Sequence, residues 1–126
     1  EIAAAAEAEA VKNKWNLVIA VVDDGGKLIY LQRMDGTQWG SIDVATQKAQ
    51  TAIGFKRSTK VFEDAIAGGR NALISLASNN VVVPLEGGVP ITAGDQIIGA
   101  IGVSGVTSQQ DGVIAKAGAD SAANLK

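Results

Sequence analysis

The sequence predicts an α+β fold in which one antiparallel sheet is flanked by helices. Two observations lead to this expectation. Short runs of branched apolar residues are joined by tight, glycine-containing turns, and alanine-rich helical segments lie near both ends of the chain. The 126 residues, 47% of them hydrophobic, are enough to bury one sizeable core. We therefore expect a single domain over residues 1–126.

The first elements predicted are a helix and a β-hairpin. Residues 2–14 are alanine-rich with good helix formers throughout, which favours a helix. Two short apolar runs, residues 17–22 and 27–31, flank the sequence Asp-Asp-Gly-Gly, whose glycines supply the positive φ angles of a tight hairpin turn. A longer helix begins at Ser41, which we expect to cap it, and its inner face is mostly alanine.

Short helices and further strands are predicted in the second half of the chain. A helix capped by Ser58 or Thr59 should end at Gly68, and a second short helix covers about residues 72–77. The strands predicted after them are residues 81–83, 88–91 and 97–104. The last of these is expected to be a central strand, because its glycines permit close approach of a helix or a ligand.

The final helix is predicted from Ser108 to about Leu125, with Ser108 as its N-cap and Asp111 in the capping-box position three residues on. The predicted order is one helix, two strands, two or three helices, about three strands and a closing helix. The sheet should therefore contain about five strands.

Histidine and cysteine are both absent, which excludes more chemistry than any other feature of the composition. Disulfides, thiolate nucleophiles and Cys/His zinc sites are excluded, so no metal site is predicted. Any catalysis must use carboxylates, lysine, arginine, tyrosine or hydroxyl groups. The net charge of −2 gives no positive field for a nucleic acid, and charged residues interrupt every apolar run before it reaches the length of a membrane span. We expect a cytoplasmic protein, although Glu1 is not a native start and leaves a removed leader open.

A series of short motifs lies in order along nearly the whole chain. They are VVDDGG at residues 21–26, QRMDG at 32–36, KAQTA at 48–52, EGGVPI at 86–91, GAIGVSG at 99–105 and QD at 110–111. The series resembles the GlcG/HbpS family, also called the haem-degrading domain family and related to the C-terminal domain of PduO. The resemblance implies a profilin-like fold with a five-stranded antiparallel sheet, homo-oligomers, and binding of haem or corrinoid-related tetrapyrroles. Because the chain has no His or Cys axial ligand, haem would be held only by weaker ligands such as Thr, Tyr or Lys.

The turn from Glu86 to Pro90 is the first candidate ligand site. Gly87 and Gly88 free the backbone to expose N–H groups toward an anion, Pro90 fixes the chain direction, and Glu86 offers a carboxylate beside them. A carboxylate or a phosphate is the kind of ligand that such a turn would hold. The alternative is that the glycine pair only makes a bend between two strands.

Charged residues on other elements supply further candidates. Arg33 and Asp35 would project from the same side if the extended backbone continues between them, and could orient a polar ligand or form a salt bridge at the rim. Lys48 lies amid small residues on the helix that begins at Ser41. It could bind an anion or act as a base, or its stem could snorkel to solvent.

The start of the last helix and one aromatic side chain complete the candidate set. Ser104 and Gly105 precede the N-terminus of that helix, whose free N–H groups and partial positive charge suit a ligand carboxylate. Asp111 is included with them as a ligand-binding residue, with helix capping as its alternative role. Trp39 is the best candidate to stack on a planar ligand, or else it fills a subunit interface.

Three functions remain open from the sequence, which does not decide whether the chain is an enzyme. The first is a non-catalytic accessory protein that holds a small carboxylate, or a planar tetrapyrrole such as haem, between the glycine turn, Arg33 and the final helix. The second is an enzyme of a catabolic pathway acting on a small carboxylated metabolite, with Asp35 or Glu86 as acid or base and Arg33 or Lys48 gripping the carboxylate. The third is an oligomeric interaction module that docks a partner protein.

Overall fold

Eleven helical and strand elements follow one another in residues 1–124, the part of the chain that the computed structural model describes. In chain order they are α1 (Ile2–Asn13), β1 (Val18–Asp23), β2 (Leu28–Arg33), α2 (Ser41–Phe55), α3 (Lys60–Ala67), the 3₁₀ helix η1 (Asn71–Leu73), α4 (Ile74–Ser78), β3 (Gly88–Ala93), β4 (Gln96–Ser104), α5 (Ser108–Asp120) and the 3₁₀ helix η2 (Ser121–Asn124).

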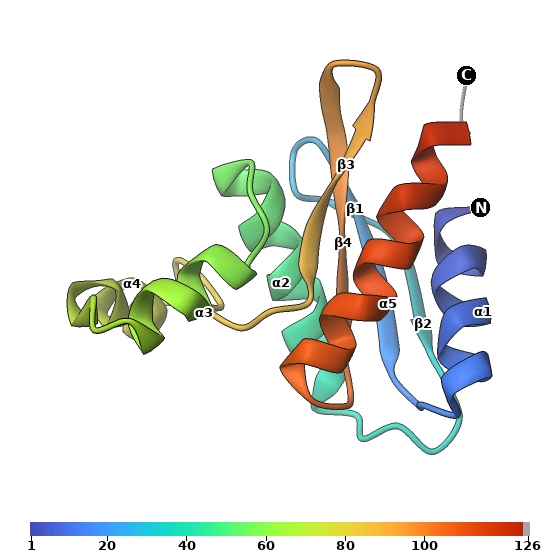
Figure 1. Ribbon diagram of the computed structural model, residues 1–126, viewed down its shortest axis with the longest axis horizontal. Coiled ribbons are helices and arrows are strands. Elements are labelled where there is room, and N and C mark those ends of the chain that lie inside the picture. The colour runs from blue at the N-terminus through green and yellow to red at the C-terminus, as the bar shows by residue number, and fades with distance from the viewer. Residues whose placement is uncertain (125–126) are drawn as a thin grey trace.

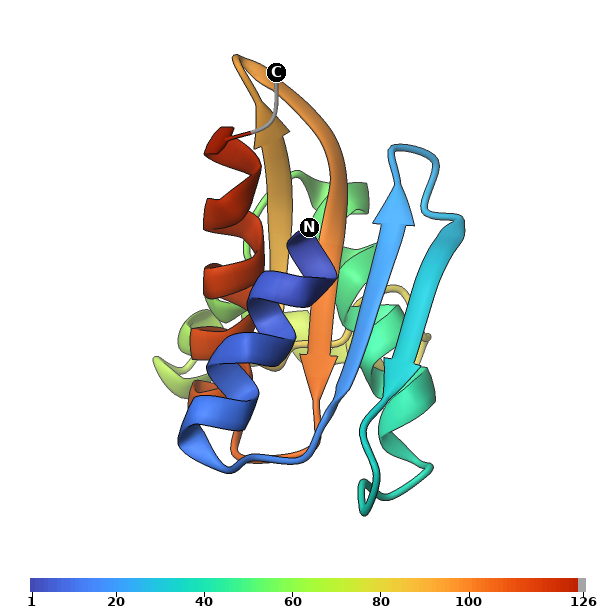
Figure 2. The ribbon, with the colours of Figure 1, turned by 90° about the vertical axis from the view of Figure 1, so that its right-hand side faces the viewer.

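One antiparallel sheet with the strand order β2-β1-β4-β3 forms the middle layer of the molecule. Helices α1 and α5 cover one face of this sheet and α2 covers the other, so the layers are helix, sheet and helix (Figures 1 and 2). The predictions of an α+β fold, an antiparallel sheet flanked by helices, a β1-β2 hairpin and an interior β4 are all confirmed.

The alternation of side chains along β1 and β4 divides the core between the two faces of the sheet. Ile19 and Val21 of β1 pack toward α1 and α5, together with Ile101 and Val103 of β4. Alternate residues of the same strands pack against α2 through its buried alanines. These residues are Val18, Ala20, Val22 and Ala100 on the strands and Ala45, Ala49 and Ala52 on α2. The alanine face predicted for α2 is confirmed, and it lets the helix lie close to the sheet.

The fifth strand predicted at residues 81–83 is wrong, and the sheet has four strands within the described residues. The backbone N–H groups of this segment find partners outside any sheet. Val83 donates to the hydroxyl of Thr51 on α2 (3.0 Å), and Val81 donates to the carbonyl of Leu76 (2.8 Å). Its branched residues suit a strand, but the hydrogen bonds to Thr51 and Leu76 take the place of a strand ladder.

The region from α3 to α4 projects away from the three layers as an arm (Figure 1). The arm and the segment that leads from it to β3 carry large apolar side chains that remain about half exposed, and these are Val61, Ile74, Val81 and Leu85. Both short helices were predicted here, although the second begins as a single 3₁₀ turn before α4. The arm adds little to the core of this chain.

The ends of α2 and α5 differ from the prediction, whereas the start of α3 agrees with it. Ser41 is the first residue of α2 and not its N-cap, which is Gly40. Helix α5 ends at Asp120 and continues only as η2, so the predicted end near Leu125 lies outside the described residues. Thr59 does occupy the N-cap position of α3, but its hydroxyl makes no cap hydrogen bond within that helix.

Candidate functional site

Five of the predicted site residues meet at the end of the sheet where α5 begins. They come from helix α2, the segment that enters β3, and the first turn of α5, and they are Lys48, Glu86, Gly87, Gly88 and Asp111. We call this group the glycine-turn centre. Segments separated by up to 63 residues in the sequence contribute to it.

A buried ion pair between Lys48 and Asp111 forms the base of the glycine-turn centre. The Lys48 Nζ lies 3.1 Å from Asp111 Oδ2 and donates to the carbonyl of Val103 at 2.9 Å. Only 1% of Lys48 is exposed, so the lysine neither snorkels to solvent nor stands free for an anion. The other carboxylate oxygen of Asp111 accepts the N–H of Val106 at 3.1 Å. Burial raises the pKa of Asp111, and Lys48 opposes this shift.

The two glycines of the turn lie directly on this ion pair and on the backbone of α2. A Cβ on Gly87 would come within 2.8 Å of the Lys48 Nζ, and the φ of +133° disfavours any other residue there. A Cβ on Gly88 would lie 2.3 Å from the Lys48 carbonyl oxygen. The N–H of Gly88 donates to the Thr59 hydroxyl at 2.9 Å, and is therefore not free to bind an anion. Close packing explains both glycines.

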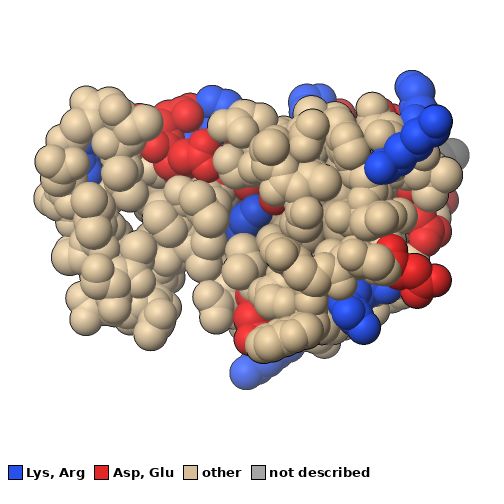
Figure 3. All heavy atoms as spheres, turned by 90° about the horizontal axis from the view of Figure 1, so that it is seen from below, with Lys and Arg blue, Asp and Glu red and all other residues tan. Residues whose placement is uncertain are grey.

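Glu86 is the part of this centre that solvent reaches. Its side chain is half-buried against the first turn of α5, where a Cβ on Gly112 would lie 2.2 Å from the Glu86 Oε2. Burial raises the pKa of Glu86; Lys60 opposes the shift, while Glu63 and Asp64 add to it. Acidic and basic atoms gather at the junction between the arm and the rest of the molecule (Figure 3). We call the surface that Glu86 shares with Lys60, Glu63 and Asp64, whose charges act on it, the arm recess.

The N-terminus of α5 is capped by a different pair of residues from the pair predicted. Thr107 is the N-cap: its hydroxyl accepts the N–H of Gln110 at 3.2 Å, and the Gln110 side chain accepts the N–H of Thr107 at 3.3 Å. Ser108 is the first helical residue, and Asp111 lies beyond the capping box. The capping box is therefore shifted by one residue, which leaves the Asp111 carboxylate for the ion pair with Lys48.

Arg33, Asp35 and Trp39 lie apart from the glycine-turn centre. Arg33 ends the edge strand β2, and β1 separates it from β4, because Val18 pairs with both Arg33 and Ser104. The Arg33 guanidinium donates to the carbonyl of Thr37 at 3.1 Å and makes no ion pair with Asp35, although both residues line one shallow pocket. Trp39 is 76% exposed in the loop before α2. The predicted site that joins Arg33 to the glycine turn is not formed within residues 1–124.

The remaining predicted residues serve the backbone near the site. Ser104 is buried at the end of β4, and Gly105 follows it with a Cβ position only 2.6 Å from the Leu17 Cα. Pro90 pairs with Ala100 inside the sheet and lines a separate pocket between β3 and the end of α5. None of the three contributes a charged group to the arm recess.

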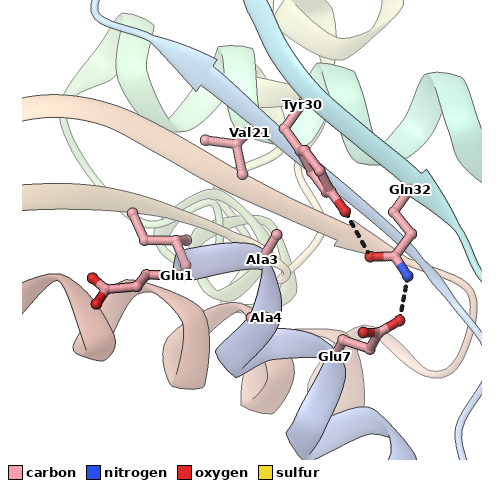
Figure 4. A pocket seen from close by; sticks show the side chains of 8 residues that line it. Glu1, Ala3, Ala4, Glu7, Val21, Tyr30 and Gln32 are labelled. Atoms are coloured by element: carbon pink, nitrogen blue, oxygen red, sulfur yellow. Dashed lines mark hydrogen bonds between the residues drawn. The ribbon is translucent and has the colours of Figure 1, made fainter.

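A pocket that the sequence analysis did not predict lies between α1 and β2 (Figure 4). Its volume is about 420 Å³, and its lining combines apolar groups of α1 and β1 with the ring of Tyr30 and the amide of Gln32. The signal that the sequence offered was the single tyrosine, Tyr30, which follows the apolar residues Leu28 and Ile29 of this strand. Its pairing with α1 depends on how that helix crosses the sheet, which no local pattern encodes.

Comparison with known proteins places the chain among proteins of the same architecture. Residues 1–120 match the family described as "Haem degrading protein HbpS-like". Protein GlcG of Escherichia coli K12 is 45% identical over 103 residues, which are 82% of this chain and 75% of that protein. This chain belongs to the GlcG/HbpS family. Among solved structures, the ORFY protein of Klebsiella pneumoniae superimposes with a TM-score of 0.89 and 33% identity, covering 99% of this chain and 87% of ORFY.

A further GlcG/HbpS relative bears on the question of cofactors. The PduOC:heme complex superimposes with a TM-score of 0.81 and 27% identity, covering 94% of this chain and 87% of PduOC. In this chain, no group of three or more Asp or Glu side chains among the described residues is arranged to hold a metal ion, and histidine and cysteine are absent. The side chains present therefore do not fit haem held by an imidazole or a thiolate. No helix in residues 1–124 is long and apolar enough to cross a membrane.

Proposed function

We propose that this chain is a non-catalytic, small-molecule-binding accessory protein of the GlcG/HbpS type, and that its ligand binds in the arm recess. The observation that carries the proposal is the position of Glu86. Its half-buried carboxylate lies on the first turn of α5, above a buried ion pair that already satisfies Lys48 and Asp111. A ligand at this place meets a preformed wall, and Glu86 is the wall's free polar group.

A small carboxylic acid is the ligand class that we favour. The N-terminus of the 13-residue helix α5 and the ammonium of Lys60 place positive potential beside Glu86. Glu63 and Asp64 place negative charge there as well, so a fully ionised ligand would be repelled. The raised pKa of Glu86 reduces this repulsion, because a protonated Glu86 carries no charge and can donate a hydrogen bond to the ligand carboxylate.

A thermal-shift screen of small mono- and dicarboxylic acids at about pH 5 and about pH 7.5 tests this proposal. We expect the active acids to stabilise the protein more at the lower pH, because they bind to the protonated form of Glu86. Glu86→Gln should remove the difference between the two pH values. Asp24→Asn, an exposed carboxylate in the β1-β2 turn, is the matched control and should keep it. A screen with no stabilising acid at either pH would contradict the carboxylate assignment.

Haem is the second ligand candidate, and its support comes from the complex formed by the relative PduOC. The absence of histidine and cysteine restricts it to binding through the porphyrin and weak oxygen or amine ligands. Titration with haem, followed by absorbance, should then give a weak complex without the spectrum of imidazole or thiolate ligation. A tight complex that Glu86→Gln leaves unchanged would assign haem to another part of the surface.

Acid–base catalysis at Glu86 is a second candidate function, favoured by the raised pKa of a half-buried carboxylate that borders a recess. Exchange of α-hydrogens of small carboxylic acids with deuterated solvent, followed by NMR, would detect proton transfer. An enzyme should lose the exchange in Glu86→Gln and keep it in Asp35→Asn, because Asp35 lies apart from the recess. Binding without exchange supports the accessory role.

Self-association is also part of the proposed function, because β2 and the arm expose more apolar surface than an isolated chain would need. Ile29 of the edge strand is 64% exposed, and Ile74 of the arm is 47% exposed. Light scattering should give the mass of an oligomer, and Ile29→Lys or Ile74→Lys should lower it. Val11→Lys, on an exposed position of α1, should not. A monomeric wild-type protein would contradict this part of the proposal.

A further inference from the structure

We propose that the pocket between α1 and β2 is a second ligand site, which takes a small aromatic or alkyl amine in its protonated form. The pocket lies across the sheet from α2 and on another part of the molecule from the arm recess, so the inference does not depend on the function proposed above. Its walls, the directions of its hydrogen bonds and its charge lead to the same class of ligand.

The apolar wall comes from three elements that leave a gap between them. Helix α1 packs on α5 and β1 and does not cover β2, so Tyr30 remains 45% exposed beside α1. Ile2, Ala3 and Val21 line the pocket together with the ring of Tyr30 (Figure 4). With a volume of about 420 Å³, the pocket lies within the range of small-molecule sites, which are mostly apolar with a few polar groups.

The polar wall is a hydrogen-bonded chain whose direction is fixed by its last member. Tyr30 Oη donates to Gln32 Oε1 at 3.1 Å, and Gln32 Nε2 donates to Glu7 Oε2 (Figure 4). An ionised carboxylate only accepts hydrogen bonds, so the Gln32 amide must direct its nitrogen toward Glu7 and its oxygen toward Tyr30. The single hydroxyl proton of Tyr30 is therefore used in its hydrogen bond to Gln32.

Apart from the second N–H of the Gln32 amide, the positions left free on this wall are acceptors. Glu7 keeps its Oε1, which accepts no hydrogen bond from the described residues, and the Tyr30 oxygen keeps its lone pairs. A ligand that satisfies the Glu7 and Tyr30 oxygens must therefore bring donors. Glu7 and Glu1 are the charged residues in the lining, and no lysine or arginine is among the lining residues. A protonated amine with an apolar body satisfies the free acceptors, the negative charge and the apolar wall together, and the face of Tyr30 also attracts a cation.

Three compounds of matched shape test this assignment on the whole chain: phenethylamine, which is a cation at neutral pH, uncharged 2-phenylethanol and anionic 3-phenylpropanoate. Binding is measured by calorimetry and mapped by NMR shifts of Val21, Tyr30 and Gln32. Phenethylamine should bind, 2-phenylethanol should bind about tenfold more weakly, and 3-phenylpropanoate should not bind. Equal affinities for all three compounds, or shifts confined to other residues, would overturn the proposal.

Two conservative variants test the polar wall. Glu7→Gln should weaken phenethylamine binding by about tenfold and bring it near to that of 2-phenylethanol. Tyr30→Phe keeps the aromatic ring and should weaken phenethylamine binding by a smaller factor than Glu7→Gln. Asp24→Asn also removes one exposed carboxylate but lies outside the pocket, and it should leave the affinity unchanged. An unchanged affinity for phenethylamine in a folded Glu7→Gln protein would overturn the assignment. It would also be overturned if the wild-type protein forms an oligomer that covers the pocket and does not bind the amine.

Discussion

The centre of the sheet and its outer parts use the same kinds of residues in opposite ways. At the centre, β1 and residues 99–104 of β4 are almost completely buried, and the charged side chains of Lys48 and Asp111 satisfy one another. At the periphery, strand β2 and the arm leave large apolar side chains exposed to solvent, and beside β2 the Glu7 carboxylate keeps an oxygen that accepts no hydrogen bond from the described residues. The centre is thus complete within one chain, whereas the periphery is suited to contacts with ligands or other chains.

This difference separates residues that hold the fold from residues available for function. Changes at the centre should cost stability, because no alternative partner exists for a buried charge or a backbone in close contact. Changes at the periphery should leave stability nearly unaltered and alter binding. Four stability measurements, in order of decreasing expected loss, test this division.

Asp111→Ala should produce the largest loss. It leaves the Lys48 ammonium buried without its counter-charge, which costs about 3–5 kcal/mol of the free energy of unfolding. Urea denaturation measures the change. Asp120→Ala breaks the exposed pair between Lys116 and Asp120 and should cost at most about 1 kcal/mol. Equal losses in the two variants would remove the distinction between centre and periphery.

Gly102→Ala should have the next largest effect. A Cβ at this position would lie 1.9 Å from the Ala45 carbonyl oxygen, so α2 must move away from the sheet, at a cost of about 1–3 kcal/mol or more. Gly54 lies on α2 itself, and no atom is within 4 Å of a Cβ added there. Gly54→Ala should therefore be neutral or stabilising by up to about 1 kcal/mol. A tolerated Gly102→Ala would show that the helix does not pack as closely as described.

Thr107→Ala removes the N-cap of α5 and should lower the free energy of unfolding by about 1 kcal/mol. Ser108→Ala removes the hydroxyl of the neighbouring residue, which makes no cap hydrogen bond, and should change it little. Thermal or urea unfolding of the two variants decides which residue is the cap. A larger loss of stability in Ser108→Ala than in Thr107→Ala would instead identify Ser108 as the N-cap.

The smallest effect concerns the pH dependence of stability at Glu86. Its pKa in the folded protein is raised above the ordinary value of 4.5, so its contribution to stability is fully present below that value and is lost as the pH rises through the folded pKa. Relative to Glu86→Gln, the wild-type protein should therefore become less stable from about pH 4 to about pH 7. A constant difference over this range would mean that burial does not perturb Glu86.

Local patterns in the sequence were sufficient for most of the fold. Alanine-rich segments, branched runs and glycine turns predicted α1, the β1-β2 hairpin, α2, β3, β4 and α5 within a few residues. The segment at 81–83 has the composition of a strand, but a strand also needs a neighbour, and its N–H groups reach Leu76 and Thr51 instead. Pairing depends on the path of the whole chain, and composition alone does not record it.

The candidate site was predicted in part, for the same reason. Lys48, Glu86 and the glycine pair were identified individually, and the structure brings them together through α2, β3 and α5. The sequence did not show that Lys48 pairs with Asp111, because 63 residues separate them. Arg33 was grouped with the glycine turn, but two strands of the sheet, β1 and β4, lie between them.

The most direct test of the proposed function is an NMR titration of the wild-type protein with the best carboxylic acid from the screen, followed at the backbone amides. Saturable shifts should be concentrated at Glu86, Gly87, Gly88 and the first turn of α5 around Gly112, and Glu86→Gln should abolish them at unchanged fold. Shifts that lie elsewhere, or that persist in the folded Glu86→Gln protein, would contradict binding in the arm recess.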